Sequence, residues 1–273
     1  MKERARIDWA LGIVGAFITA LFVGKLFVGE DSILYGSILT PAVMLYAAAL
    51  PKLAALLGGA VAAYACAQGF DEGSSSRRAW SLMTLWLGTW FIAQSMLGYY
   101  QLILVEAAPF PSAADALFMV GYPAMIIAVH IFIRTYVSTG MFGDARDHAA
   151  AAFIAAVPLF VAAILILTPA LASGGETLEL ALNVAYPALD LVAMVPTIVL
   201  LRITLKLRGG SLFWVWTLIC AGLCFMVVGD LLFGYFELLG LGFLEPLLDL
   251  CYIASYAFIA RGVYQQLLIV RGS

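Results

Sequence analysis

Charged residues are scarce in this chain. Of its 273 residues, 11% are Asp, Glu, Lys or Arg, whereas 64% are hydrophobic, and the mean hydropathy is +1.03. A water-soluble domain needs a polar exterior and typically has a charged fraction of ~25%. The composition therefore excludes a soluble globular protein and predicts an all-α integral membrane protein.

Long polar segments and catalytic motifs are also missing. No loop between the apolar segments is long enough to fold as a soluble domain. The sequence contains no Gly-rich phosphate loop, no nucleophile elbow and no H-E-x-x-H motif. We therefore expect a non-enzymatic protein without catalytic residues, which contacts membrane lipids and no nucleic acid.

Cysteine and histidine are few and poorly placed for metal or haem chemistry. All four cysteines lie in apolar segments, which argues against a disulfide framework. Cys220 and Cys224 share a helix face, but small cysteines in a span usually serve packing, so we expect no metal site. Haem ligation by His130 would need a second axial ligand, and the other histidine, His148, belongs to the edge of a different span. We do not expect haem, and the sequence names no other cofactor.

Long apolar runs dominate what remains. A spanning helix needs about 20 apolar residues, and polar breaks divide the chain into eight candidate spans: 8–29, 33–69, 79–104, 114–137, 149–171, 178–201, 211–238 and 246–268. The first follows "MKERAR" without a cleavage site, so we interpret it as a retained span. The second is interrupted by Pro41, Pro51 and Lys52, and is either one kinked helix with an interfacial tail or two helices.

The distribution of basic residues gives the orientation. With eight spans and the N-terminus inside, twelve of the 14 Lys and Arg residues fall at or near cytoplasmic ends: Lys2, Arg4, Arg6, Arg77, Arg78, Arg134, Arg146, Arg202, Lys206, Arg208, Arg261 and Arg271. Dividing the second segment would reverse every later span and export most of this charge. The sequence therefore predicts an inner-membrane protein with both termini in the cytoplasm.

Two segments of the chain are alike. "WSLMTLWLGTWFIAQSMLGYYQL" (80–102) aligns with "WTLICAGLCFMVVGDLLFGYFEL" (216–238) at a shift of 136 residues, and the helices that follow align at 134. The corresponding pairs include Trp80 with Trp216, Gln94 with Asp230, Gln101 with Glu237, Asp115 with Asp249, and Tyr122 with Tyr256. An even number of spans separates the copies, which predicts two parallel four-helix halves, 1–140 and 141–273.

Polar residues recur at helical spacing inside the spans. Residues seven apart share a face of a helix, and such stripes comprise Gln94 and Gln101; Asp115 and Tyr122; Asn183, Tyr186 and Asp190; Asp230 and Glu237; and Asp249, Tyr252 and Tyr256. A carboxylate at membrane depth costs at least ~2.5–3.5 kcal/mol, so it normally faces the bundle interior or water. The stripes predict an acidic, outward-facing crevice between the two halves.

This crevice has two interpretations. It is a site for a small extracytoplasmic ligand, a cation or coupled protonation, or its polar groups pair with one another to hold the helices together. Lys25, in the outer half of the first span, is a candidate partner for one of the acids. The candidate ligand-binding residues are Lys25, Gln94, Gln101, Asp115, Tyr122, Tyr186, Asp190, Asp230, Glu237, Asp249 and Tyr256.

Four ordered strings carry a family resemblance. "DSILYGSIL" (31–39), "PFPSAADALFMVGYP" (109–123), "LNVAYPALDLVAM" (182–194) and "GDLLFGY" (229–235) resemble the N-terminal membrane region of bacterial and archaeal GGDEF/EAL proteins, which make or degrade c-di-GMP. Related regions precede PAS or histidine-kinase modules. The resemblance implies sensing at the membrane and matches Asp115, Tyr122, Tyr186, Asp190, Asp230 and Tyr235, without assigning them a ligand.

The chain ends at "YQQLLIVRGS", where a cytoplasmic output module would begin in such proteins. We therefore expect a membrane sensor or signal-transduction module that acts through a partner. The alternatives are a transporter of small molecules or ions, and a membrane subunit that anchors a larger complex.

Overall fold

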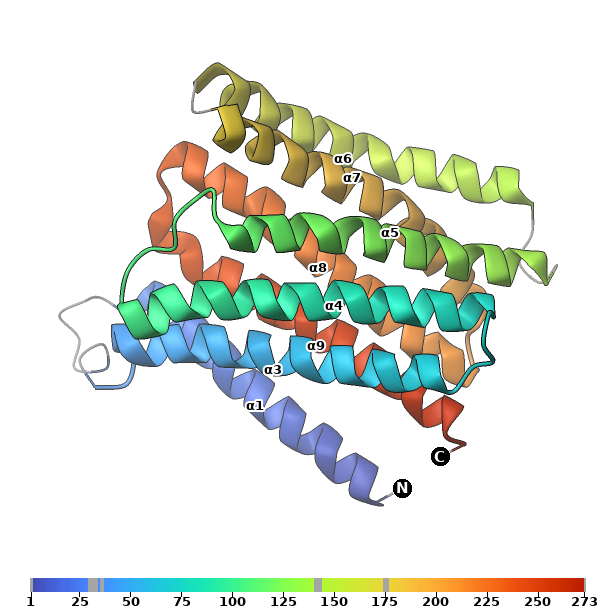
Figure 1. Ribbon diagram of the computed structural model, residues 1–273. Coiled ribbons are helices and arrows are strands. Elements are labelled where there is room, and N and C mark those ends of the chain that lie inside the picture. The colour runs from blue at the N-terminus through green and yellow to red at the C-terminus, as the bar shows by residue number, and fades with distance from the viewer. Residues whose placement is uncertain (1, 29–33, 35–36, 140–143, 174–176, 273) are drawn as a thin grey trace.

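The protein is a bundle of long helices (Figure 1). The computed structural model describes residues 2–28, 34, 37–139, 144–173 and 177–272, and in these ranges it contains no strand. The elements are α1 (Lys2–Phe27), α3 (Pro41–Gln68), α4 (Ser75–Tyr99), the π-helix η1 (Tyr100–Leu104), α5 (Ala113–Ser138), α6 (Ala145–Ser173), α7 (Thr177–Lys206), α8 (Ser211–Leu239), the 3₁₀ helix η2 (Gly242–Leu244) and α9 (Glu245–Val270).

Successive long helices run in alternating directions, and both chain termini lie at the same end of the bundle (Figure 1). This terminal end also carries the turns at 69–74 and 207–210. The opposite, distal end carries the loop at 105–112 between η1 and α5.

The expected membrane character is confirmed at the level of helix length and composition. Among the described residues, five helices are long and apolar enough to cross a membrane: Pro41–Gln68, Ala113–Ser138, Thr177–Lys206, Ser211–Phe236 and Gly242–Val270. The protein is thus an all-helical protein with apolar helices suited to lipid contact.

The structure describes most of the span predicted at 33–69. A single helix, α3, begins at Pro41 and continues through Pro51 to Gln68. The Thr40 side chain accepts a hydrogen bond from the Val43 amide, and Pro at the first helical position needs no amide partner. From Pro41 onward the run is therefore one helix, and residues 33, 35 and 36 lie outside the described part of the chain.

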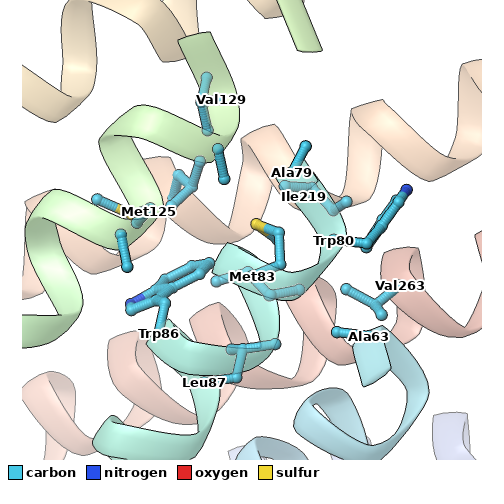
Figure 2. Packing of buried hydrophobic residues seen from close by; sticks show 14 of the residues in the cluster. Ala63, Ala79, Trp80, Met83, Trp86, Leu87, Met125, Val129, Ile219 and Val263 are labelled. Atoms are coloured by element: carbon cyan, nitrogen blue, oxygen red, sulfur yellow. The ribbon is translucent and has the colours of Figure 1, made fainter. Parts of the chain in front are cut away.

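Aromatic side chains fill the centre of the bundle. Trp80 of α4 stacks on Trp216 of α8 with 6.2 Å between ring centroids, and Phe132 of α5 contacts both rings. Met83 and Trp86 lie on the side of α4 that faces Met125 of α5, whereas Trp80 points to the other side, toward Val263 (Figure 2). Among the described residues, six helices, α3, α4, α5, α7, α8 and α9, thus contribute to one continuous apolar core.

Helices α8 and α9 approach most closely where glycine removes the side chain. A Cβ atom on Gly222 would lie 2.6 Å from the Ser255 carbonyl oxygen, and one on Gly262 would lie 2.7 Å from the Val215 carbonyl oxygen. The two contacts are reciprocal, one glycine on each helix against the backbone of the other. Small residues at such crossings let helices in membranes pack backbone to backbone.

Candidate functional site

Four helices bring carboxylates and tyrosines together in the half of the bundle nearer the distal end. We call this group the acid–tyrosine network: Asp115 and Tyr122 of α5, Tyr186 and Asp190 of α7, Asp230 of α8, and Tyr252 of α9. Tyr122 and Asp190 are each 1% exposed. The seven-residue spacing in α5 and the i, i+4 spacing in α7 direct each pair to one helix face.

The Tyr122 hydroxyl lies at the centre of this network. It is 2.8 Å from Oδ1 of Asp190 and 3.3 Å from Oδ2 of Asp230. The other oxygen of Asp230 accepts a hydrogen bond of 2.7 Å from the Tyr252 hydroxyl. One tyrosine therefore links α5 to α7 and α8, and a second links α8 to α9.

Asp190 and Asp230 are close neighbours. Oδ1 of Asp190 and Oδ2 of Asp230 lie 2.8 and 3.3 Å from the same Tyr122 hydroxyl oxygen, and two carboxyl groups can bond to each other only if one of them is protonated. With both ionised, Oδ2 of Asp190 is a buried oxygen without a hydrogen-bond partner. Buried polar atoms are nearly always paired, so this oxygen requires an explanation.

Asp115 is held at the start of α5. Its Oδ2 accepts hydrogen bonds from the backbone amide and hydroxyl of Ser112, which forms a capping box at the helix N-terminus. Its Oδ1 accepts a 2.7 Å hydrogen bond from the Tyr186 hydroxyl. The Tyr186 ring contacts the Tyr122 ring edge-on, with centroids 6.3 Å apart. Asp115 is thus fully satisfied and joins the network to the distal loop.

A second polar group lies across the bundle. We call it the lysine–glutamine cluster: Lys52 of α3, Gln94 of α4, and Asp249 and Tyr256 of α9. Lys52 Nζ forms a 2.9 Å ion pair with Asp249, and the Gln94 amide donates to the Tyr256 hydroxyl at 3.5 Å. Trp90 lies between the two groups, 5.3 Å from the Tyr122 ring and 6.1 Å from the Tyr256 ring.

Two residues of these groups were not among the candidates from the sequence. Lys52 was considered only as an interruption of a span, yet it is the partner of Asp249; Lys25, the lysine proposed for such a role, lies in the last turn of α1. Tyr252 was recognised in a stripe but not as a site residue. A lysine inside an apolar run is rare at membrane depth and normally pairs with an acid. The position of Lys52 in the sequence could therefore have identified it as a site residue.

Besides Lys25, one candidate, Gln101, is not part of either group. Gln101 is exposed in the π-helix η1, where the wider turn changes the register after Gln94. The side chain of Glu237 lies outside the described residues. Seven candidates remain in hydrogen-bonded contact: Gln94, Asp115, Tyr122, Tyr186, Asp190, Asp230 and Tyr256. Asp249 joins them through Lys52.

The network is packed closed around Tyr122 and Asp190, and these side chains do not line an open crevice. A hollow of about 410 Å³ lies instead at the terminal end, lined by Ser75, Arg78, Ile131, Arg134, Thr135 and Ser138. In the part of the chain that the structure describes, no group of three or more His, Cys, Asp or Glu side chains has a metal-binding arrangement. The acid–tyrosine network can accept protons or small cations and can couple four helices.

Comparison with models of known protein families, with curated proteins and with solved structures finds no match for this chain.

Proposed function

We propose that this protein is a non-enzymatic membrane sensor, or signal-transduction module, whose responsive site is the acid–tyrosine network. The observation that carries the proposal is the Tyr122 hydroxyl, which bonds to Asp190 of α7 and reaches Asp230 of α8. A change in charge or occupancy at these carboxylates alters bonds between helices, so it alters how the helices pack.

Helix α7 has the features of a movable element. Pro187 and Pro196 lie inside it, on either side of Asp190. Proline removes a backbone hydrogen bond and clashes with the preceding turn, so helices bend at such positions. A rearrangement at Asp190 therefore has a route along α7 to Lys206 at the terminal end.

We propose that the chain crosses the inner membrane eight times and has both termini in the cytoplasm. The eight spans form two parallel four-helix halves, α1 to α5 and α6 to α9. Three observations support it: the termini share one end of the bundle, α3 packs on α9 as its counterpart α7 packs on α5, and Trp80 stacks on its counterpart Trp216. The resemblance to membrane regions of c-di-GMP signalling proteins agrees with a sensing role.

Transport is a weaker alternative because the bundle is filled below the network. Between Asp190 and the terminal end, α7 contributes Leu200 and Ile203, both fully buried, and the Trp80–Trp216 stack occupies the centre. The buried hydroxyls of Thr197 and Thr204 bond back to their own helix. Among the described residues, this layer is apolar, which favours a sensor over a transporter.

Paired spin labels on the purified, reconstituted protein test the proposal. Labels on Ser138→Cys and Ser211→Cys, both exposed residues at the terminal end, are placed in a background whose native cysteines are replaced. We expect Asp230→Asn in the network to change the distance distribution between α5 and α8. The matched control, Asp144→Asn, alters an exposed acid and leaves the distribution unchanged.

The contrary result is equally clear. If neither Asp190→Asn nor Asp230→Asn changes the distances while both variants stay folded, the network does not move the helices and the sensor proposal is wrong. Flux of a solute into proteoliposomes that Asp230→Asn abolishes would identify a transporter instead.

A further inference from the structure

We propose that Asp190 and Asp230 together hold one proton, so that the ligand of the acid–tyrosine network is a proton bound between two carboxylates. This inference rests on the proposed function, since it names what the same site binds, but its test measures the proton directly and not the movement of helices.

The carboxyl oxygens of the pair have too few hydrogen-bond donors around them. The oxygens of the pair are approached by two tyrosine hydroxyls, Tyr122 and Tyr252, and each hydroxyl has one hydrogen to donate. Tyr252 is committed to Asp230 at 2.7 Å, and Tyr122 is closer to Asp190 than to Asp230. Oδ2 of Asp190 then remains without a donor. A proton on one carboxyl supplies the missing hydrogen, which bridges Asp190 and Asp230.

The hydrogen-bond partners of the pair carry no positive charge. They are the hydroxyls of Tyr122 and Tyr252, and in the described part of the chain neither acid forms an ion pair with Lys, Arg or His. Two ionised carboxylates in contact repel each other, and burial at membrane depth raises the cost further. Binding one proton leaves a single negative charge, which Tyr122 and Tyr252 solvate by hydrogen bonding.

The lysine–glutamine cluster is the counterpart of the network in the two similar segments of the chain. Gln94 corresponds to Asp230, and Asp249 and Tyr256 correspond to Asp115 and Tyr122. Gln94 reaches Tyr256 as Asp230 reaches Tyr122, and Asp249 pairs with Lys52 of α3 where Asp115 pairs with Tyr186 of α7.

Asp230 is therefore replaced by a neutral residue, Gln94, in the counterpart cluster. Its remaining acid, Asp249, has a lysine as partner. Lys52 compensates the charge of Asp249, so this cluster serves as an internal reference that holds the helices together. Of the two groups, the acid–tyrosine network brings two carboxylates to one tyrosine hydroxyl, and this arrangement requires a proton.

Infrared difference spectroscopy on the reconstituted protein tests the inference. A protonated carboxylic acid has a carbonyl stretch that an ionised carboxylate lacks. We expect such a band in the wild type in neutral buffer, shifted in heavy water and by incorporation of aspartate labelled with carbon-13, and lost in strongly alkaline buffer.

Substitution assigns the band. In Asp190→Asn and in Asp230→Asn, the new amide donates to the remaining carboxylate and removes its repulsion, so we expect the band to be lost in each variant. Asp249→Asn is the matched control, because it changes an acid at a comparable depth of the bundle that is already paired with Lys52, and it leaves the band in place. If a variant does not fold, the wild type labelled with carbon-13 aspartate is sufficient to test the inference.

Two results overturn the inference. One is the absence of an aspartic acid carbonyl band from the wild type in neutral buffer. The other is a band that appears only when sodium is withdrawn, which makes a metal cation the occupant. If the carbonyl band is present but the spin-label distances do not change, the proton site is supported and the sensor proposal is wrong. If the distances change but the band is absent, the sensor proposal is supported and the proton site is wrong.

Discussion

The indole rings of Trp80 and Trp216 stack at the centre of the bundle, with centroids 6.2 Å apart and planes inclined by 26°. Both side chains are 1% exposed. The two residues occupy the same position in the two similar segments of the sequence, one in α4 and one in α8. The Nε1–H of Trp216 donates to the Tyr136 hydroxyl at 2.7 Å, which fixes the orientation of the stack.

Removing this stack should destabilise the bundle strongly. We expect Trp80→Ala to lower the free energy of unfolding by about 3 kcal/mol, because it leaves a cavity between α4, α5 and α8 that the surrounding helices cannot fill. The change is measured by circular dichroism, as an increasing fraction of denaturing detergent in mixed micelles unfolds the protein. Trp214→Ala is the control: Trp214 is 59% exposed, and its loss should have little effect. Equal stability of the two variants would contradict the central role of the stack.

The Tyr122 hydroxyl should matter more than its ring. We expect Tyr122→Phe to cost about 1–3 kcal/mol, since it keeps the packing but removes the donor that approaches two buried carboxylates. The same unfolding measurement applies. Tyr235→Phe makes the same chemical change at a residue that is 47% exposed, and should be neutral. A neutral Tyr122→Phe would show that the carboxylates are satisfied without this hydroxyl.

The crossing of α8 and α9 should not tolerate a methyl group. In Gly222→Ala the new Cβ meets backbone, the Ser255 carbonyl oxygen at 2.6 Å, so the helices must separate; overpacking of this kind costs about 1–3 kcal/mol. Gly88→Ala is a helical control with nothing within 4 Å of its Cβ position, and it should be neutral or slightly stabilising. Thermal aggregation in detergent distinguishes the two, and equal midpoints would refute the close crossing.

The ion pair between Lys52 and Asp249 should show energetic coupling. We expect Lys52→Met and Asp249→Asn each to destabilise the protein, and the double variant to lose less than the sum, with a coupling of about 0.5–3 kcal/mol. The side chains are 12% and 31% exposed. When one partner is replaced, the charge of the other is therefore only partly solvated. A double-mutant cycle of unfolding free energies gives the coupling, and additive losses would mean that the pair contributes nothing.

The eight-span topology predicts which loops lie on which side of the membrane. Single cysteines at Asp71→Cys, in the turn between α3 and α4, and at Glu106→Cys, between η1 and α5, replace exposed residues in a background without native cysteines. In intact cells, an impermeant maleimide should label Glu106→Cys and not Asp71→Cys. Labelling of both positions, or the reverse pattern, contradicts the proposed orientation.

The sequence was a good guide to the helices because hydrophobic length is a local property. Spans predicted at 114–137 and 246–268 differ by a few residues from α5 and α9. The late start of α3 was not foreseen, since the apolar residues before Pro41 look the same as those after it. Proline at a first helical turn marks a boundary that hydropathy alone does not detect.

The polar site was only partly predictable, because periodicity places a residue on a face but does not choose its neighbour. The spacing of Asp115 and Tyr122 on α5 was recognised, and both face the interior. Nothing in the spacing told that Tyr122 would reach two acids on two other helices, or that the partner of Asp249 would be Lys52 and not a tyrosine.

By itself, the sequence determined that the chain is apolar and helical, where its long helices run, and which acids are too costly to leave facing lipid. The packing of α5 against α7, and of α8 against α9, decided the rest. It placed Asp190 beside Asp230 and gave Asp249 a lysine, because the distance between two charges on different helices is a property of tertiary structure that no local pattern of residues contains.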